Sequence, residues 1–118
     1  MKAYRVENQE KGNGIWRNFD GTFNPIFTKL SDGLAKSLPM EDSDFYRFDN
    51  KQWFSACDER EKLTKWFSKQ DVIEMLEMGY KVYEFEIASC RFVSKFEICF
   101  VREDIINQKE IDYKEIWK

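Results

Sequence analysis

The side chains that could do chemistry in this sequence are carboxylates, arginines, lysines, serines, tyrosines and cysteines, because the chain has no histidine. Activation of a serine or cysteine nucleophile by histidine is therefore excluded, and so is a histidine-ligated metal site. Cys57, Cys90 and Cys99 are scattered and lack the spacing of a structural zinc motif, so we predict no metal site. Any catalysis would have to use the remaining groups.

Three short features could take part in chemistry or binding, and each has a simpler structural explanation. Cys57 falls at the start of a predicted helix, where a thiol can have a lowered pKa, but without histidine a buried, unreactive thiol is favoured. Glu84 and Glu86 are two residues apart, which is typical of the solvent-facing side of a strand. Residues 12–14, Gly-Asn-Gly, could approach a phosphate, yet their context predicts a turn.

The elements that position these groups begin with a strand at residues 3–7, where the two faces alternate. An Asp-Gly pair predicts a hairpin turn within residues 18–25. Residues 28–44 are the least regular part of the chain, and we expect a mobile loop there. A short strand is predicted at residues 45–48.

Two helices are predicted next, over about residues 58–67 and 69–78. Asp58 begins a capping-box pattern for the first, and Ser68 offers a start signal for the second. Apolar residues then recur at helical spacing, and Gly79 stands where a left-handed residue commonly ends a helix.

After the helices, the spacing of apolar residues changes from a period of 3.6 residues, typical of a helix, to a period of 2, typical of a strand. Alternation predicts strands at residues 83–87 and 92–102, whereas the tail at 104–118 fits a helix and a strand about equally. The chain is therefore predicted to form a single α+β domain over residues 1–118. Its sheet would be mixed and largely antiparallel, with the two helices packed on it.

Composition narrows the classes of function. With 42% hydrophobic and 17% aromatic residues among 118, the chain is predicted to be globular, with some aromatics left exposed to anchor a partner. The net charge of −3 lacks the basic surface of a nucleic-acid-binding protein, so we expect no direct nucleic-acid partner. An odd number of cysteines, no signal peptide and no long apolar run predict a cytoplasmic protein without a membrane partner.

The order of elements in residues 53–102, together with the Tyr-Arg strand at the start, resembles ADP-ribosyltransferase-like domains. The resemblance implies NAD as the cofactor, with Arg5 and Ser55 as cofactor-binding residues. Arg5 would hold the dinucleotide and Ser55 would shape the nicotinamide pocket. Glu97 would bond the ribose hydroxyl and stabilise the oxocarbenium-like transition state, so that Arg5, Ser55 and Glu97 form the catalytic set.

Each of these residues also has a structural explanation. Arg5 could pair with Glu7 or Glu97 across a sheet, and Ser55 could bond the backbone at a helix start. Glu97 could be an ordinary solvent-facing strand residue. Lys95 stands where many members carry glutamine or glutamate, so an inactive relative of the transferases is also consistent with the pattern.

The whole chain is similar to small proteins of phages and mobile elements, through its Y-R-V-E opening, the segment at residues 66–80 and its late hydrophobic strand. This resemblance implies a small cytoplasmic protein that acts by binding a bacterial protein and needs no cofactor. One such role is inhibition of a bacterial defence system, anti-CRISPR-like or other. Protein binding is the leading expectation, and NAD-dependent ADP-ribosyl transfer is the alternative.

Overall fold

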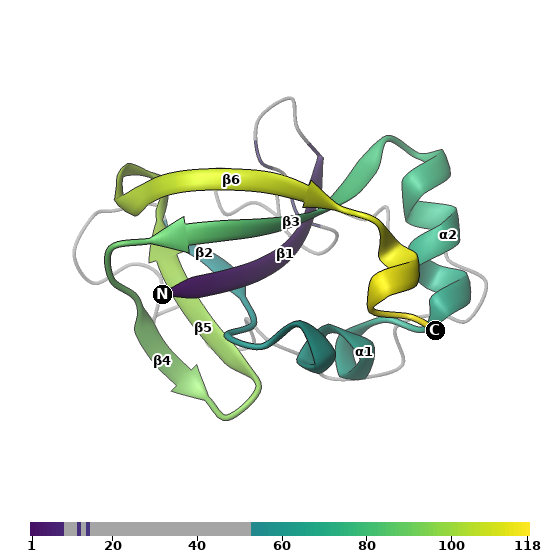
Figure 1. Cartoon of the computed structure of the whole chain (residues 1–118). Coiled ribbons are helices and arrows are strands. Elements are labelled where there is room, and N and C mark those ends of the chain that lie inside the picture. Colours follow the sequence, from purple (N-terminus) through teal and green to yellow (C-terminus); the bar gives the residue numbers. More distant parts are fainter. Residues whose placement is uncertain (9–11, 13, 15–52) are drawn as a thin grey trace.

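The computed structural model describes residues 1–8, 12, 14 and 53–118. The predicted hairpin at 18–25, loop at 28–44 and strand at 45–48 lie outside the described residues. The elements, drawn in Figure 1, are β1 (Lys2–Asn8), β2 (Trp53–Ala56), η3 (Arg60–Lys62), α1 (Leu63–Trp66), α2 (Lys69–Glu77), β3 (Tyr80–Ile87), β4 (Arg91–Ser94), β5 (Glu97–Val101), η4 (Arg102–Asp104), β6 (Ile105–Ile111) and η5 (Tyr113–Glu115).

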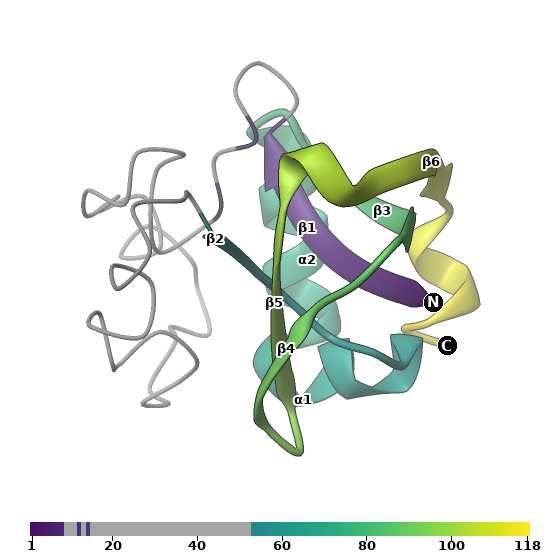
Figure 2. The ribbon, with the colours of Figure 1, turned by 90° about the vertical axis from the view of Figure 1, so that its left-hand side faces the viewer.

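The described strands form two antiparallel three-stranded sheets, in the orders β1-β3-β6 and β2-β5-β4. The α+β class and the antiparallel pairing are confirmed, but the predicted single sheet is divided. The sheets meet at one bridge, where the Tyr4 N–H donates to the Cys57 carbonyl at 2.7 Å and the Cys57 N–H donates back at 2.9 Å. Among the described residues this is the one isolated β-bridge, and β2, β5 and β4 otherwise pair with one another in their own sheet (Figure 2).

The predicted start signal forms at the second helix but not at the first. At α2 the capping box is complete, because the Asp71 N–H donates to Ser68 Oγ at 3.0 Å and the Ser68 N–H donates to the Asp71 carboxylate at 3.4 Å. Gly79 ends this segment with a φ of 93°. The predicted first helix is shorter and begins with a 3₁₀ turn, since the Asp58 carboxylate binds Lys62 at 2.7 Å instead of capping the backbone.

The predicted strand at 92–102 is a hairpin, β4 to β5, with a turn at Lys95 and Phe96. The sequence gives no Gly or Asn to mark this turn, and the Phe96 N–H instead donates to Ser94 Oγ at 3.2 Å. The tail was equally consistent with a helix and a strand, and its first part forms the strand β6. Near the C-terminal end, the Trp117 indole N–H donates to the Phe67 carbonyl at 2.9 Å and holds the tail against the body of the protein.

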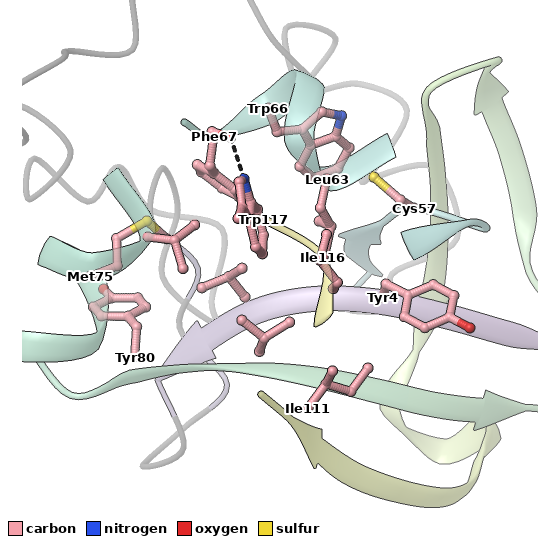
Figure 3. Packing of buried hydrophobic residues seen from close by; sticks show 13 residues of the cluster. Tyr4, Cys57, Leu63, Trp66, Phe67, Met75, Tyr80, Ile111, Ile116 and Trp117 are labelled. Atoms are coloured by element: carbon pink, nitrogen blue, oxygen red, sulfur yellow. Dashed lines mark hydrogen bonds between the residues drawn. The ribbon is translucent and has the colours of Figure 1, made fainter. Parts of the chain in front are cut away.

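The β1-β3-β6 sheet has a hydrophobic core on each face, because alternate residues of β1 and β3 point to opposite sides. One core lies beneath the helices and the C-terminal segment (Figure 3). It consists of Tyr4, Val6, Cys57, Leu63, Trp66, Phe67, Val72, Met75, Tyr80, Val82, Ile111, Ile116 and Trp117. The other lies between the two sheets and consists of Ala3, Phe54, Ala56, Tyr83, Phe85, Ile87, Ile98 and Phe100.

Candidate functional site

Arg5 lies in β1 and is bound on every side of its guanidinium. Its Nε donates to Glu7 Oε1, its Nη1 to the Ser55 carbonyl and its Nη2 to the Gly12 carbonyl, each at 2.8 Å. The side chain of Glu7 is 1% exposed, and its two oxygens also accept hydrogen bonds from Arg102 at 2.7 and 3.1 Å. The Arg5–Glu7 pair therefore forms, within β1, as part of an Arg-Glu-Arg triad in which Arg5 and Glu7 are buried and the Arg102 side chain is 34% exposed.

The triad closes one end of the core between the sheets. The guanidinium carbons of Arg5 and Arg102 lie 5.2 and 5.0 Å from the centre of the Phe54 ring. Such stacking offsets part of the cost of burying Arg5 and of removing most of the Arg102 side chain from water. Arg102 was not singled out by the sequence, because its partner Glu7 is 95 residues away along the chain.

Ser55 and Glu97 lie on one face of the β2-β5 pair, while the Arg5 guanidinium packs toward the other. Ser55 is opposite Cys99 in the register, and Glu97 is two residues from Cys99, so all three side chains share a face. Phe54, against which Arg5 stacks, points to the opposite face. Ser55 and Glu97 are 1% and 4% exposed. The structure thus brings Arg5 to the Ser55 backbone but does not place the three side chains around one open cleft.

A second polar cluster surrounds Glu84 of β3 on the helix-covered side. The expectation that Glu84 faces solvent is wrong, since the residue is only 7% exposed. Its oxygens accept hydrogen bonds from the Tyr4 hydroxyl at 3.1 Å, Arg60 at 3.3 Å and Lys2 at 3.2 Å, and Lys109 lies 3.6 Å away. These cations come from three separate elements, so sequence alternation alone could not reveal them.

The electrostatics of this cluster favour the ionised form of the Glu84 carboxylate. Burial works to raise the pKa of Glu84, but hydrogen bonds from Lys2 and Tyr4 and the positive charge of Lys109 outweigh it and hold the pKa below the usual value. Burial raises the pKa of the Tyr4 phenol. A carboxylate of low basicity beside a neutral phenol is poorly suited to abstract a proton near neutral pH, so the cluster stabilises the fold.

Cys57 is fully buried, as the simpler interpretation of the sequence had it. Its thiol donates to the Phe96 carbonyl at 3.5 Å. Burial, reinforced by the negative charge of Asp58, raises the pKa of Cys57 far above its usual value. The thiolate needed for nucleophilic chemistry is therefore not formed.

Two of the four exposed large hydrophobic side chains in the described part of the chain lie on the β4–β5 hairpin. Phe92 is 66% exposed on β4, and Phe96 is 38% exposed at the turn. Lys95 lies between them along the chain, with its ammonium 4.9 Å from the centre of the Phe96 ring. The sequence predicted exposed aromatics but not which ones, because Phe92 and Phe96 fit the alternation of a single buried strand.

Residues 1–8, 12, 14 and 53–118 contain no cluster of three or more cysteines and carboxylates that could hold a metal ion. No helix in the described part of the chain has the length and apolar character needed to cross a bilayer.

Comparison with known proteins gives a family match. The model of the family described as Bacteriophage T4 Y00F protein matches residues 1–114. No curated protein and no solved structure matches the chain. The family match covers nearly all of the 118 residues, including every described strand.

Proposed function

The chain belongs to the Bacteriophage T4 Y00F protein family and is thus a phage protein, and we propose that it acts by binding a protein of the bacterial host. One observation carries the proposal, namely the exposed aromatic hairpin, with Phe92 at 66% exposure. Aromatic side chains dominate the binding energy of many protein interfaces, where they fill pockets on the partner. Moving an exposed phenylalanine side chain from water into an apolar pocket is favourable. A partner that buries Phe92 would therefore gain binding free energy from it.

The buried polar groups support binding over catalysis. Arg5, Ser55 and Glu97 are each less than a tenth exposed, and the Arg5 nitrogens are occupied by the protein's own acceptors. Opening them to a dinucleotide would break the Arg-Glu-Arg triad. Loss of one partner from a buried ion pair is costly.

The proposed biological role is inhibition of a bacterial defence system in the host cytoplasm. A phage protein gains from disabling such a system, and a binding protein of this size needs no cofactor to do so. This role would appear as phage survival: a phage sensitive to a given defence should form more plaques on defended cells that express the protein.

The test of binding is capture from a bacterial lysate with the purified protein as bait. Wild type should retain a host protein, and Phe92→Ser should lose it. Ile106→Ser is the matched control, because Ile106 is 68% exposed on β6, in the other sheet. Equal capture by wild type and Phe92→Ser would refute the proposal.

NAD-dependent ADP-ribosyl transfer through Arg5, Ser55 and Glu97 is the second candidate. The contact of Arg5 Nη1 with the Ser55 carbonyl favours it, because it brings two of the three residues together. Its test is transfer of label from NAD to lysate proteins by wild type, with Glu97→Gln as the inactive variant. Label that is absent, or that persists in Glu97→Gln, would reject the candidate.

A further inference from the structure

We infer that the partner of the β4–β5 hairpin presents an acidic protein surface with an apolar pocket for Phe92. The inference rests on the binding function proposed above and adds the chemistry of the partner. Two features of the described structure carry it: an apolar strip made of Met1, Cys90 and Phe92 at the base of the hairpin, and positive charge on an otherwise acidic protein.

The apolar strip runs from the N-terminus to Phe92. Met1 is 43% exposed, and its sulfur lies 3.3 Å from the sulfur of Cys90, just before β4. Cys90 packs against the core between the sheets. Phe92 is opposite Ile98 in the register, so it points to the same side of the sheet as that core yet remains largely in solvent. A pocket that accepted Phe92 would extend this core across the interface.

The charge of the hairpin is positive. Residues 91–101 contain Arg91, Lys95 and one carboxylate, Glu97, which is only 4% exposed, so the exposed charge of the hairpin is positive although the whole chain has a net charge of −3. Arg91 stacks on the Trp53 ring at 4.2 Å, whereas Lys95 is exposed at the turn. Among the described residues, Lys95 forms no ion pair.

The described carboxylates near the hairpin are buried or already engaged, and Glu97, the first residue of β5, is only 4% exposed. Glu86 pairs with the N-terminal amine at 3.1 Å, and Asp104 accepts a hydrogen bond from Ser89 at 3.1 Å. A carboxylate that complements Lys95 would therefore come from the partner. Such a charge at the rim of an interface, beside a buried aromatic anchor, sets orientation and specificity.

A nucleic acid fits this surface less well than a protein. Binding to a phosphate backbone depends on many basic contacts, and each contributes to a steep salt dependence. The hairpin offers two cations, and one of them is stacked on an indole. The net charge of the chain would also repel a polyanion.

The experiment uses the full chain with the photocrosslinker p-benzoylphenylalanine at position 92, irradiated in a bacterial lysate. We expect a crosslink to a protein peptide that contains aspartate or glutamate next to apolar residues. Lys95→Glu should reduce the crosslink about tenfold, by adding repulsion to the lost attraction. Lys118→Glu, the same charge change at the exposed C-terminal residue, should leave it unchanged.

The outcomes separate this inference from the proposed function. If Phe92→Ser loses the host protein but Lys95→Glu retains it, the acidic partner is refuted while binding through the hairpin stands. A crosslink to nucleic acid, to a second copy of the chain or to a peptide without carboxylates also overturns the inference. If Phe92→Ser captures the same protein as wild type, both proposals fail.

Discussion

Replacing Glu7 by glutamine tests how the Arg-Glu-Arg triad is held. The carboxylate has three hydrogen bonds from two guanidinium groups, at 2.7, 2.8 and 3.1 Å, and Arg5 is only 7% exposed. Glutamine keeps the size of the side chain but removes the only negative charge of the triad and turns an amide donor toward arginine donors. Breaking a buried pair in this way costs about 3–5 kcal/mol of unfolding free energy.

Urea unfolding followed by tryptophan fluorescence measures this loss. With a denaturant slope of about 1–3 kcal/mol per molar, the midpoint of Glu7→Gln should fall by about 2 M. The matched control is Glu110→Gln, because the Glu110 side chain is 56% exposed in its pair with Lys81 and should cost no more than about 1 kcal/mol. A Glu7→Gln variant as stable as the Glu110→Gln variant would refute the account of the triad.

Three further predictions concern the other buried groups. Because Glu84 has a lowered pKa in the fold, its stabilisation is present above the unfolded pKa of about 4.3 and is lost as pH falls through the folded pKa; urea midpoints measured from pH 6 to about 3 should fall less in Glu84→Gln than in wild type. The Cys57 thiol should resist Ellman's reagent in the native protein and react once urea unfolds it; rapid native modification would contradict its burial. Trp117→Phe removes the indole donor to the Phe67 carbonyl and should lower the unfolding free energy by about 1–3 kcal/mol, and an unchanged thermal midpoint would contradict this.

Local sequence signals predicted the fold where the interactions are local. Ser68, three residues before Asp71, forms its capping box, and Gly79 ends the segment because it adopts a positive φ. Alternation predicted strands where β1 and β3 form, although β3 begins three residues earlier than predicted, at Tyr80. The prediction of one strand over residues 92–102 was wrong, because the chain turns at Lys95 and Phe96. This turn contains no Gly or Asn, so the alternating pattern continues through it without a break.

The polar clusters depend on contacts between distant segments, which one sequence does not reveal. Period-2 alternation predicted that Glu84 faces solvent, but helices and the C-terminal segment cover that side of the sheet. Its partners Lys2 and Arg60 belong to segments distant from Glu84 in the sequence. The sequence offered Glu7 and Glu97 as partners of Arg5 across a sheet, and the pair that forms is with Glu7, two residues away in the same strand. The contact of Glu7 with Arg102, which completes the triad, could be identified only from the structure, because the two residues are 95 positions apart in the sequence.

The most direct test of the central claim is the dissociation constant between the captured host protein and the chain, for wild type and for Phe92→Ser. If the hairpin is the binding surface, loss of the 66% exposed ring should weaken affinity by about tenfold or more, while Ile106→Ser binds as wild type does. Thermal midpoints of both variants should match wild type, since both side chains are exposed. Equal dissociation constants for wild type and Phe92→Ser would contradict the account.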